Sequence, residues 1–364
     1  SESVLTTKSA AIKPVTTFET SIKSAPTSSG RFVFFAEKRG GHTGIREYYV
    51  DSTTNTMDAQ QITMHVNKYI TGEATQLLAS SNVDLLLVRT DDTDSEDTIF
   101  VYRYTWVGST KVQASWSTWK FDGKVRAMGF VEADLILVIE RTLSGTTRSY
   151  IEKINLGRDN AETETDMSSA ILLDRRVKLT SNSSYTNFAS TYYTDAGNSN
   201  ADVVYIDKYG DTKSATEISA MTLSSSNPLW AGIKYDFLYR FSEPVVRVAE
   251  GQAATTAGRI QLRTMSVNYA NTGFFKVVVK PQGHDVLDGT TAVRSTSTHT
   301  MNGRIVSQKE NQTDKSPIVS GTFRFPVYSV STGVQVEIQS DNHLPCSFQG
   351  GEWEAQFHQR TRRL

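Results

Sequence analysis

The segment Asp84–Val88, with the sequence DLLLV, recurs 50 positions later as Asp134–Val138, with the sequence DLILV. At the same offset the apolar positions of Phe100–Tyr104 fall on those of Tyr150–Ile154. Each copy within Asn82–Leu156 therefore consists of an apolar strand, a polar loop and a second apolar strand. Repeats of about 40 to 50 residues that are built only of strands are typical of β-propeller blades.

A third copy lies upstream, where Val33–Ala36 matches Leu85–Val88 at an offset of 52. One blade cannot bury both faces of its small sheet, so blades must stack around a ring. Known propellers have at least about four blades, whereas three can be recognised in this sequence. The repeat thus predicts a partial β-propeller, with either further blades that leave no clear repeat or a longer polypeptide of which this chain is a part.

The repeat makes two local predictions. Each of the two downstream copies should form one antiparallel hairpin, and the two hairpins should lie in neighbouring sheets that are related by a rotation. Leu86 and Ile136 should occupy equivalent positions. In the first half of the chain, Asp58–Tyr69 has its apolar residues about one helical face apart, which makes it the best helix candidate there, although a loop turn is an alternative.

The composition narrows the class of protein. Lys and Arg number 38 against 39 Asp and Glu in 364 residues, so the formal net charge of −1 gives no reason to expect a tight, sequence-independent grip on nucleic acid. Cys346 is the single cysteine, so no disulfide can form within the chain. No apolar run approaches the roughly 18 residues of a membrane-spanning helix. Ser1–Val4 shows neither an initiator Met nor a signal-peptide pattern, as expected of a chain whose beginning was removed or not included.

Four segments differ in pattern and predict the domain organisation. Residues 1–28 form a lead-in strand and linker, residues 29–160 the propeller blades, residues 161–234 a loop-rich insertion or excursion, and residues 235–364 a β-sandwich-like domain. In the last segment Val319–Val327 and Val334–Ile338 alternate apolar with polar residues, as in a sheet with one solvated face. The predicted fold class is all-β, a partial β-propeller followed by a β-sandwich-like domain.

Metal and cofactor sites are not expected. Asp91–Asp97 is acid-rich like a calcium loop, but it lacks Gly at the sixth position, and an EF-hand register places Arg103 where the bidentate Glu belongs. A solvated hairpin loop is therefore the better interpretation. The six histidines are scattered without metal-ligand spacing.

A nucleophile elbow, a phosphate loop and a Cys–His nucleophile pattern are all missing from the sequence. Glu352 and Glu354 would share one face of a strand and could supply the paired carboxylates of a glycosidase, but a charged sheet face has the same spacing. The five tryptophans could stack on sugars or single-stranded nucleic acid, or could instead fill blade cores and interfaces. Arg360, Arg362 and Arg363 could contact DNA or another subunit, or form a solvated tail.

Five ordered segments carry a resemblance to a known family: Tyr102–Trp106, Val112–Trp119, Gly258–Tyr269, Asn271–Phe275 and Glu352–Arg363. Together they resemble the tail tubular protein B family, the nozzle proteins of short-tailed bacteriophages. The resemblance covers nearly the whole chain and is weakest over Gly157–Asn200. The family's chains are about twice as long, and this chain resembles their carboxy-terminal half.

The resemblance implies a structural protein of the virion tail. It implies a ring of identical subunits, six in the intact protein, that forms the end of the tail tube, contacts the tail tubular protein A ring and the tail fibres, and encloses a channel for double-stranded DNA in transit. The family has no catalytic motif to carry over. The near-zero net charge predicts that the channel conducts DNA while binding it only weakly.

Two other functions stay open on the sequence alone. A carbohydrate-binding or glycan-cleaving β-propeller protein of a phage tail would need exposed tryptophans clustered with carboxylates at one site. A propeller adaptor would bind only other proteins. The mass and symmetry of particles formed by the intact polypeptide would separate both from a ring-forming tail protein.

Overall fold

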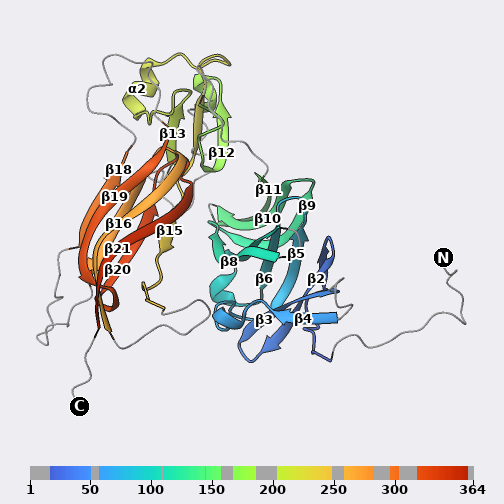
Figure 1. The fold of residues 1–364 in the computed structure, drawn as a ribbon. Helices are drawn as coiled ribbons and strands as arrows, with labels where there is room; N and C mark the ends of the chain where they lie inside the picture. The colour runs from blue at the N-terminus through green and yellow to red at the C-terminus, as the bar shows by residue number, and fades with distance from the viewer. Residues whose placement is uncertain are drawn as a thin grey trace, which may run out of the picture. The chain divides into compact units, whose positions relative to one another are not determined.

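The computed structural model describes residues 17–50, 57–107, 110–143, 145–156, 167–185, 203–247, 258–281, 296–302 and 318–359. Regular structure in these residues is almost entirely antiparallel β-sheet, as the sequence predicts. The chain divides into two compact units, Ser1–Arg158 and Asp159–Leu364 (Figure 1). No helix among the described residues is long and apolar enough to cross a membrane.

The described residues of the first unit form three sheets in chain order. The first sheet has the strand order β1-β2-β3-β4, the second β5-β6-β7-β8, and the third β11-β10-β9. Sequential strands pair antiparallel, so each sheet is a meander. The bounds are β1 Thr27–Ser29, β2 Phe32–Arg39, β3 His42–Val50, β4 Met57–Gln61, β5 Ala74–Ser80, β6 Leu85–Thr90, β7 Thr98–Val107, β8 Thr110–Lys120, β9 Lys124–Val131, β10 Asp134–Leu143 and β11 Thr146–Asn155.

The hairpins predicted from the repeat are present. β6 pairs with β7, with Leu86 opposite Tyr102. β10 pairs with β11, with Val138 opposite Ile151. The two hairpins lie in separate sheets, so the prediction of two successive sheets is confirmed for this part of the chain.

The second sheet is buried on both faces, which explains its unbroken apolar run. Leu86 and Val88 pack in a core with side chains of the first sheet such as Phe34. Leu85 and Leu87, which point to the opposite face, pack in a second core with side chains of the third sheet. The three sheets are therefore layered in sequence, with the second sheet between the other two.

The third sheet shows that the packing register differs from the repeat by one residue. Leu135 and Leu137 face the second sheet, as members of the core that also holds Leu85 and Leu87. Ile136 points to the other face and is only half-buried, whereas Leu86 is fully buried. The residue that faces the preceding sheet, as Leu86 does, is thus Leu135, because a shift of one residue moves a side chain to the opposite face of a strand.

The helix predicted over Asp58–Tyr69 is wrong. The structure has the edge strand β4 followed by the short 3₁₀ turn η1, Met64–Val66. Pairing of Ala59 with Tyr48 holds the first part in the sheet, and Ile62 joins the first core. The apolar residues of this segment therefore belong to one strand and one turn. The pairing of β4 with β3 outweighs the weak helical periodicity of the sequence.

The second unit begins with a small sheet of its own. This fourth sheet has the strand order β12-β14-β13, with β12 at Asp174–Leu179, β13 at Val203–Asp207 and β14 at Leu229–Ile233. The helix α2, Ala215–Ala220, starts with a capping box between Ser214 and Glu217. Its buried Ile218 packs with strand residues such as Leu229 in a separate core. The described part of residues 161–234 therefore contains a small folded layer.

Two larger sheets follow and share one core. The fifth sheet has the order β15-β20-β17-β18 and the sixth β19-β16-β21. Phe275 from the fifth sheet and Phe325 from the sixth belong to the same buried cluster. The bounds are β15 Phe237–Arg240, β16 Gly258–Thr272, β17 Phe275–Pro281, β18 Ser297–Met301, β19 Val319–Val330, β20 Val334–Ser340 and β21 Phe348–Gln359.

Candidate functional site

The sequence-predicted contact residues Arg360, Arg362 and Arg363 lie outside the described residues. Within the described ranges, no group of three or more His, Cys, Asp and Glu side chains is arranged to hold a metal ion. What the structure brings together is a set of buried or half-buried carboxylates, each paired with cations from neighbouring strands.

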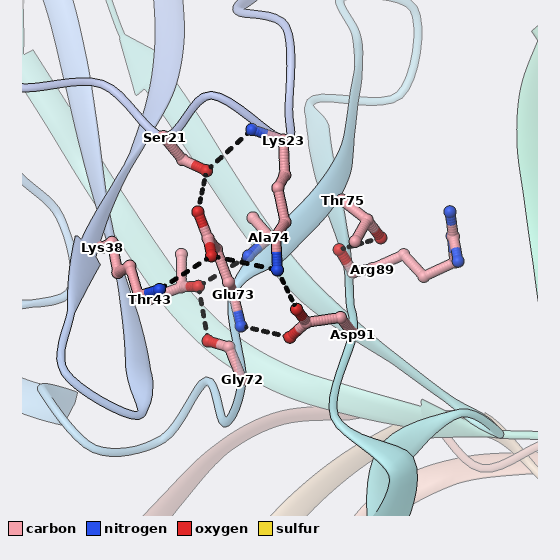
Figure 2. A network of polar contacts seen from close by, with 10 residues as sticks. All are labelled: Ser21, Lys23, Lys38, Thr43, Gly72, Glu73, Ala74, Thr75, Arg89 and Asp91. Carbon is pink, nitrogen blue, oxygen red and sulfur yellow. Dashed lines mark hydrogen bonds and ion pairs between the residues drawn. The ribbon is translucent and has the colours of Figure 1, made fainter.

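The most connected of these clusters centres on Glu73, at the start of the second sheet (Figure 2). Its carboxylate accepts a hydrogen bond of 2.8 Å from Ser21 Oγ and lies 3.2 Å from both Lys23 Nζ and Lys38 Nζ. Ser21 and Lys23 come from the segment before β1, and Lys38 from β2. The cluster therefore joins the lead-in segment, the first sheet and the second sheet at one point.

Asp91 extends the cluster from the end of β6. Its carboxylate is 2.5 Å from Lys23 Nζ and accepts a hydrogen bond of 2.7 Å from the backbone N–H of Glu73. Gly72 makes this approach possible, because its φ is +76° and a Cβ there would lie 2.8 Å from the backbone N of Asp92. The two acids thus share one lysine across a tight backbone contact.

The electrostatics of the cluster favour its charged form. The hydrogen bond from Ser21, then those from the two lysines, hold the pKa of Glu73 below its ordinary value despite its burial. Lys23 and the Glu73 N–H likewise lower the pKa of Asp91. The hydrogen bonds to Asp91 and Glu73 raise the pKa of Lys23. A carboxylate held in this way is a poor proton donor near neutral pH, so the cluster is suited to holding sheets together.

Two further acids of the Asp91–Asp97 loop, Asp92 and Glu96, also have partners within the chain. Asp92 caps the short η2 turn, Thr93–Ser95, by accepting from the Asp94 N–H. Glu96 lies 2.6 Å from Lys124 and 2.8 Å from Arg126, on the third sheet. These contacts agree with the interpretation of the segment as a hairpin loop, because the carboxylates of Asp91, Asp92 and Glu96 are engaged by neighbouring side chains and backbone.

A second buried acid links the first and second sheets. Glu47 on β3 is 1% exposed and forms an ion pair with Lys111 on β8. The Lys111 ammonium also donates a hydrogen bond of 3.1 Å to the Tyr102 hydroxyl. Burial raises the pKa of that hydroxyl, and the nearby Glu47 carboxylate acts in the same direction. The group therefore stays a neutral phenol beside the ion pair.

Polar contacts also link the second and third sheets. The Gln76 side-chain amide donates to the Met128 carbonyl at 2.7 Å and accepts from the Met128 N–H at 3.1 Å. On the third sheet the guanidinium of Arg141 is buried between Asp122 and Glu152. The Gln76 hydrogen bonds supplement the apolar core between the second and third sheets with directional contacts, whereas the Arg141 ion pairs stabilise the third sheet itself.

Most of the tryptophans pack against cores and do not form a shared surface for stacking on sugars or nucleic-acid bases. Trp106 and Trp116 pack against the core between the first two sheets, and Trp119 against the core between the second and third. The cationic groups of Arg176 and Lys178 lie over the ring of Trp230, 4.6 Å and 5.3 Å from its centroid. Trp353 is 42% exposed. The described tryptophans do not share one core or one sheet.

Glu352 and Glu354 lie on β21, where both are exposed on the same face of the sixth sheet. Glu354 is engaged by Arg324 at 2.6 Å, and it accepts a hydrogen bond from Thr264 at 3.1 Å. The pair is therefore part of a polar sheet face, with one member held in an ion pair across the sheet.

The second unit has its own buried carboxylate, Glu337 on β20. Arg240 and Lys280, from the two neighbouring strands, approach it to 2.9 Å and 2.7 Å. Burial by itself would raise the pKa of Glu337, but the hydrogen bonds from Lys280, Arg240 and Gln339 bring it below the ordinary value. The acid is thus charged and holds three strands of the fifth sheet together.

Sequence reasoning missed Glu47, Glu73 and Glu337. Each stands alone among ordinary strand residues, and their cationic partners are far away in the sequence, so no motif spacing marks them. Glu337 does sit in an alternating strand pattern, but that pattern predicts a solvated position. In the structure it is buried and forms ion pairs with Arg240 and Lys280.

Comparisons with known proteins place the chain among phage tail components. The bacteriophage nozzle protein family matches residues 1–364. The tail tubular protein gp12 of Escherichia phage T7 is 23% identical over 386 aligned residues, which cover 98% of this chain and 46% of gp12. The chain therefore spans about half the length of this relative.

Proposed function

The chain belongs to the bacteriophage nozzle protein family, whose members are structural parts of the virion tail and not enzymes, and we propose that it forms part of the tube wall through which the phage genome is ejected. The observation that carries this proposal is the family match over the whole chain. The structure is consistent with it, because the buried carboxylates of Glu47, Glu73 and Glu337 are engaged in ion pairs that join strands or sheets.

The three layered sheets of the first unit are proposed to be β-propeller blades. In a propeller each blade uses one face for the preceding blade and the opposite face for the next, which is how the second sheet packs. The outer face of the third sheet supports a further neighbour, since it carries Ile136, Val138 and Ile151, the last being 79% exposed. In the second unit, the fifth and sixth sheets around one core are proposed to be the β-sandwich-like domain.

The assembly is proposed to be a ring of identical subunits, six in the intact protein, that encloses a channel for double-stranded DNA. The ring would contact the tail tubular protein A ring and the tail fibres. The name of gp12, tail tubular protein, supports a tube-forming role for that protein. Because this chain corresponds to about half of gp12, the ring and its partners are proposed as properties of the whole polypeptide. The net charge of −1 favours a wall that binds passing DNA weakly.

The proposal is tested by locating the chain in the phage particle. An antibody against this chain, carrying a gold label, is expected to bind the tail tube in electron micrographs of intact virions. A second antibody raised against the capsid protein serves as the matched control for position. Gold confined to the fibres or to the capsid would contradict the proposal.

A further inference from the structure

The loop that connects β20 to β21, residues 341–347, contacts both parts of the second unit. On one side, the Gly273 N–H in the turn between β16 and β17 donates a hydrogen bond of 2.9 Å to the Pro345 carbonyl. On the other side, the Leu172 N–H, just before β12, donates a hydrogen bond of 2.7 Å to the His343 carbonyl. The loop therefore joins the fourth sheet to the fifth and sixth sheets.

The side chain of His343 is buried in this joint, with only 5% of the residue exposed. Its Nε2 atom lies 2.8 Å from the carbonyl oxygen of Gly210. Because a carbonyl oxygen can only accept, the ring donates through Nε2. Gly210 has a φ of +86° in the turn after β13, and the Asp207 carboxylate holds that turn by accepting from the N–H groups of Tyr209 and Asp211. The ring is therefore fixed against a well-ordered acceptor.

Apolar groups surround the joint. Leu344, next to His343, packs with Met167 and Ala170 in a buried cluster. The segment 167–173, which includes these two residues, has no ionisable side chain. A positive charge on the His343 ring would therefore lie away from water, where an ionised group is strongly disfavoured.

The charges nearest the ring act in opposite directions. Burial is the largest cause that holds the pKa of His343 below its ordinary value of 6.5, and the Lys234 ammonium, at the end of β14, acts in the same direction. The hydrogen bond to Gly210 and the Asp207 carboxylate oppose this shift without cancelling it. The ring is therefore neutral near pH 7.

The acids of the adjacent elements already have cationic partners. Asp207 lies 3.0 Å from Lys213, and Asp341, at the start of the loop, lies 2.8 Å from Lys276. These two carboxylates can compensate a protonated ring only in part. The other ionisable side chains of the turn, the loop and the end of β14 are Lys208, Tyr209, Asp211, Cys346 and Lys234.

We propose that His343 makes this joint acid-sensitive, so that protonation of its ring opens the loop of residues 341–347 and loosens the fourth sheet from the sheets that follow. The inference concerns the second unit alone and does not depend on a place in the tube wall. In the open loop the ring is hydrated and takes up a proton near its ordinary pKa, whereas the closed loop resists protonation. The open form therefore gains as the pH falls below about 6.5, and the gain levels off below the pKa of the closed loop.

The test uses Cys346, the single cysteine of the chain, which lies half-buried in this loop. Burial raises the pKa of its thiol to about 11, so the closed loop reacts slowly with a thiol reagent. The complete chain is labelled with dithiodipyridine, and the rate for the urea-unfolded chain at the same pH is divided by the native rate to give a protection factor. From about pH 7.5 to about pH 5.5 this factor is expected to fall severalfold, with roughly tenfold as the limit one pH unit below an open-loop pKa of about 6.5. Constant protection over this range would overturn the proposal.

Two substitutions identify the titrating group. His343→Gln keeps an N–H donor for Gly210 but cannot take up a proton, so its protection factor should no longer depend on pH. His358→Gln, at an exposed position of β21, should retain the response of the parent. A response like that of the parent in His343→Gln would overturn the proposal.

A third variant decides the question if His343→Gln opens the loop at every pH. Lys234→Glu replaces a cation that disfavours the protonated ring with an anion that favours it, at an exposed position that tolerates the change. The closed loop then accepts the proton more readily, so the acid-induced fall in protection should become smaller than in the parent. A fall that is unchanged or larger in Lys234→Glu would overturn the proposal.

Discussion

The layered packing of the first unit makes a prediction about three neighbouring core positions. Leu86 and Leu135 are each fully buried and face the preceding sheet, whereas Ile136 is half-buried on the outer face of the third sheet. Truncation of a fully buried leucine to alanine costs about 2 to 5 kcal/mol, because the removed methyl groups leave a cavity. Ile136→Ala removes three carbons that are only partly out of water, and at about 0.8 kcal/mol per buried CH₂ this amounts to roughly 1 kcal/mol.

The assay is urea unfolding of the complete chain, followed through tryptophan fluorescence. Trp106, Trp116 and Trp119 pack against the two cores of the first unit and report on its unfolding. With a slope of about 2 kcal/mol per molar urea, Leu86→Ala and Leu135→Ala should lower the midpoint by roughly 1 M or more, and Ile136→Ala by about half that or less. If Ile136→Ala cost as much as Leu86→Ala while Leu135→Ala cost little, the sheets would pack in the register of the sequence repeat and the reasoning would be refuted.

Three further predictions concern charge and chemistry. Acid should destabilise both units, because the native-state pKa values of Glu73 and Glu337 lie below the ordinary value of 4.5. The stability that these carboxylates contribute is fully present above pH 4.5. It is lost as the pH falls through their native-state pKa values. A urea midpoint that stays constant from pH 5 to about pH 3 would contradict this linkage. The chain should show no turnover of peptidoglycan, capsule or lipopolysaccharide, and activity that disappears in Glu352→Gln or Glu354→Gln would show that the polar sheet face is catalytic. The assembled ring should bind duplex DNA weakly with a shallow salt dependence, as expected for one or two phosphate contacts per subunit. Submicromolar binding at physiological salt would show instead that the channel binds DNA tightly. Loss of that binding on changing Arg360, Arg362 and Arg363 to glutamine would identify these residues as the DNA contacts.

The sequence predicts the strands of the first unit well because they are strongly apolar and repeated. The run Leu85–Val88 has no polar residue, and only a strand buried on both faces needs such a run. The repeat does not determine the side to which each residue points, because one extra or missing residue before a strand reverses its faces. This is why Ile136 matches Leu86 in sequence while Leu135 matches it in packing.

Edge elements of the second unit were harder to predict. The strand character of Tyr235–Phe241 and Arg259–Tyr269 is visible in their apolar residues, and β15 and β16 lie there. The sequence of β21, Phe348–Gln359, contains two glycines and many polar residues, so its pattern alone does not identify a strand. It is held as a strand by its pairing with β16, which is a tertiary interaction that local propensity does not report.

The buried acids and their ion pairs could not be predicted from sequence motifs. Glu73 depends on Ser21, Lys23 and Lys38, which are drawn from two other segments of the chain. Such a cluster has no fixed spacing, so only the fold reveals it. The resemblance carried by longer segments was more informative about function, because it depends on many positions at once.

We propose above that the polypeptide carrying this chain builds a ring of identical subunits in the phage tail. The most direct measurement is the mass and rotational symmetry of the particles that the intact polypeptide forms, obtained by native mass spectrometry and electron microscopy of the same sample. We expect closed rings with cyclic symmetry, six subunits to a ring, and an open central channel. Monomers alone, or dimers with a single two-fold axis and no channel, would contradict it.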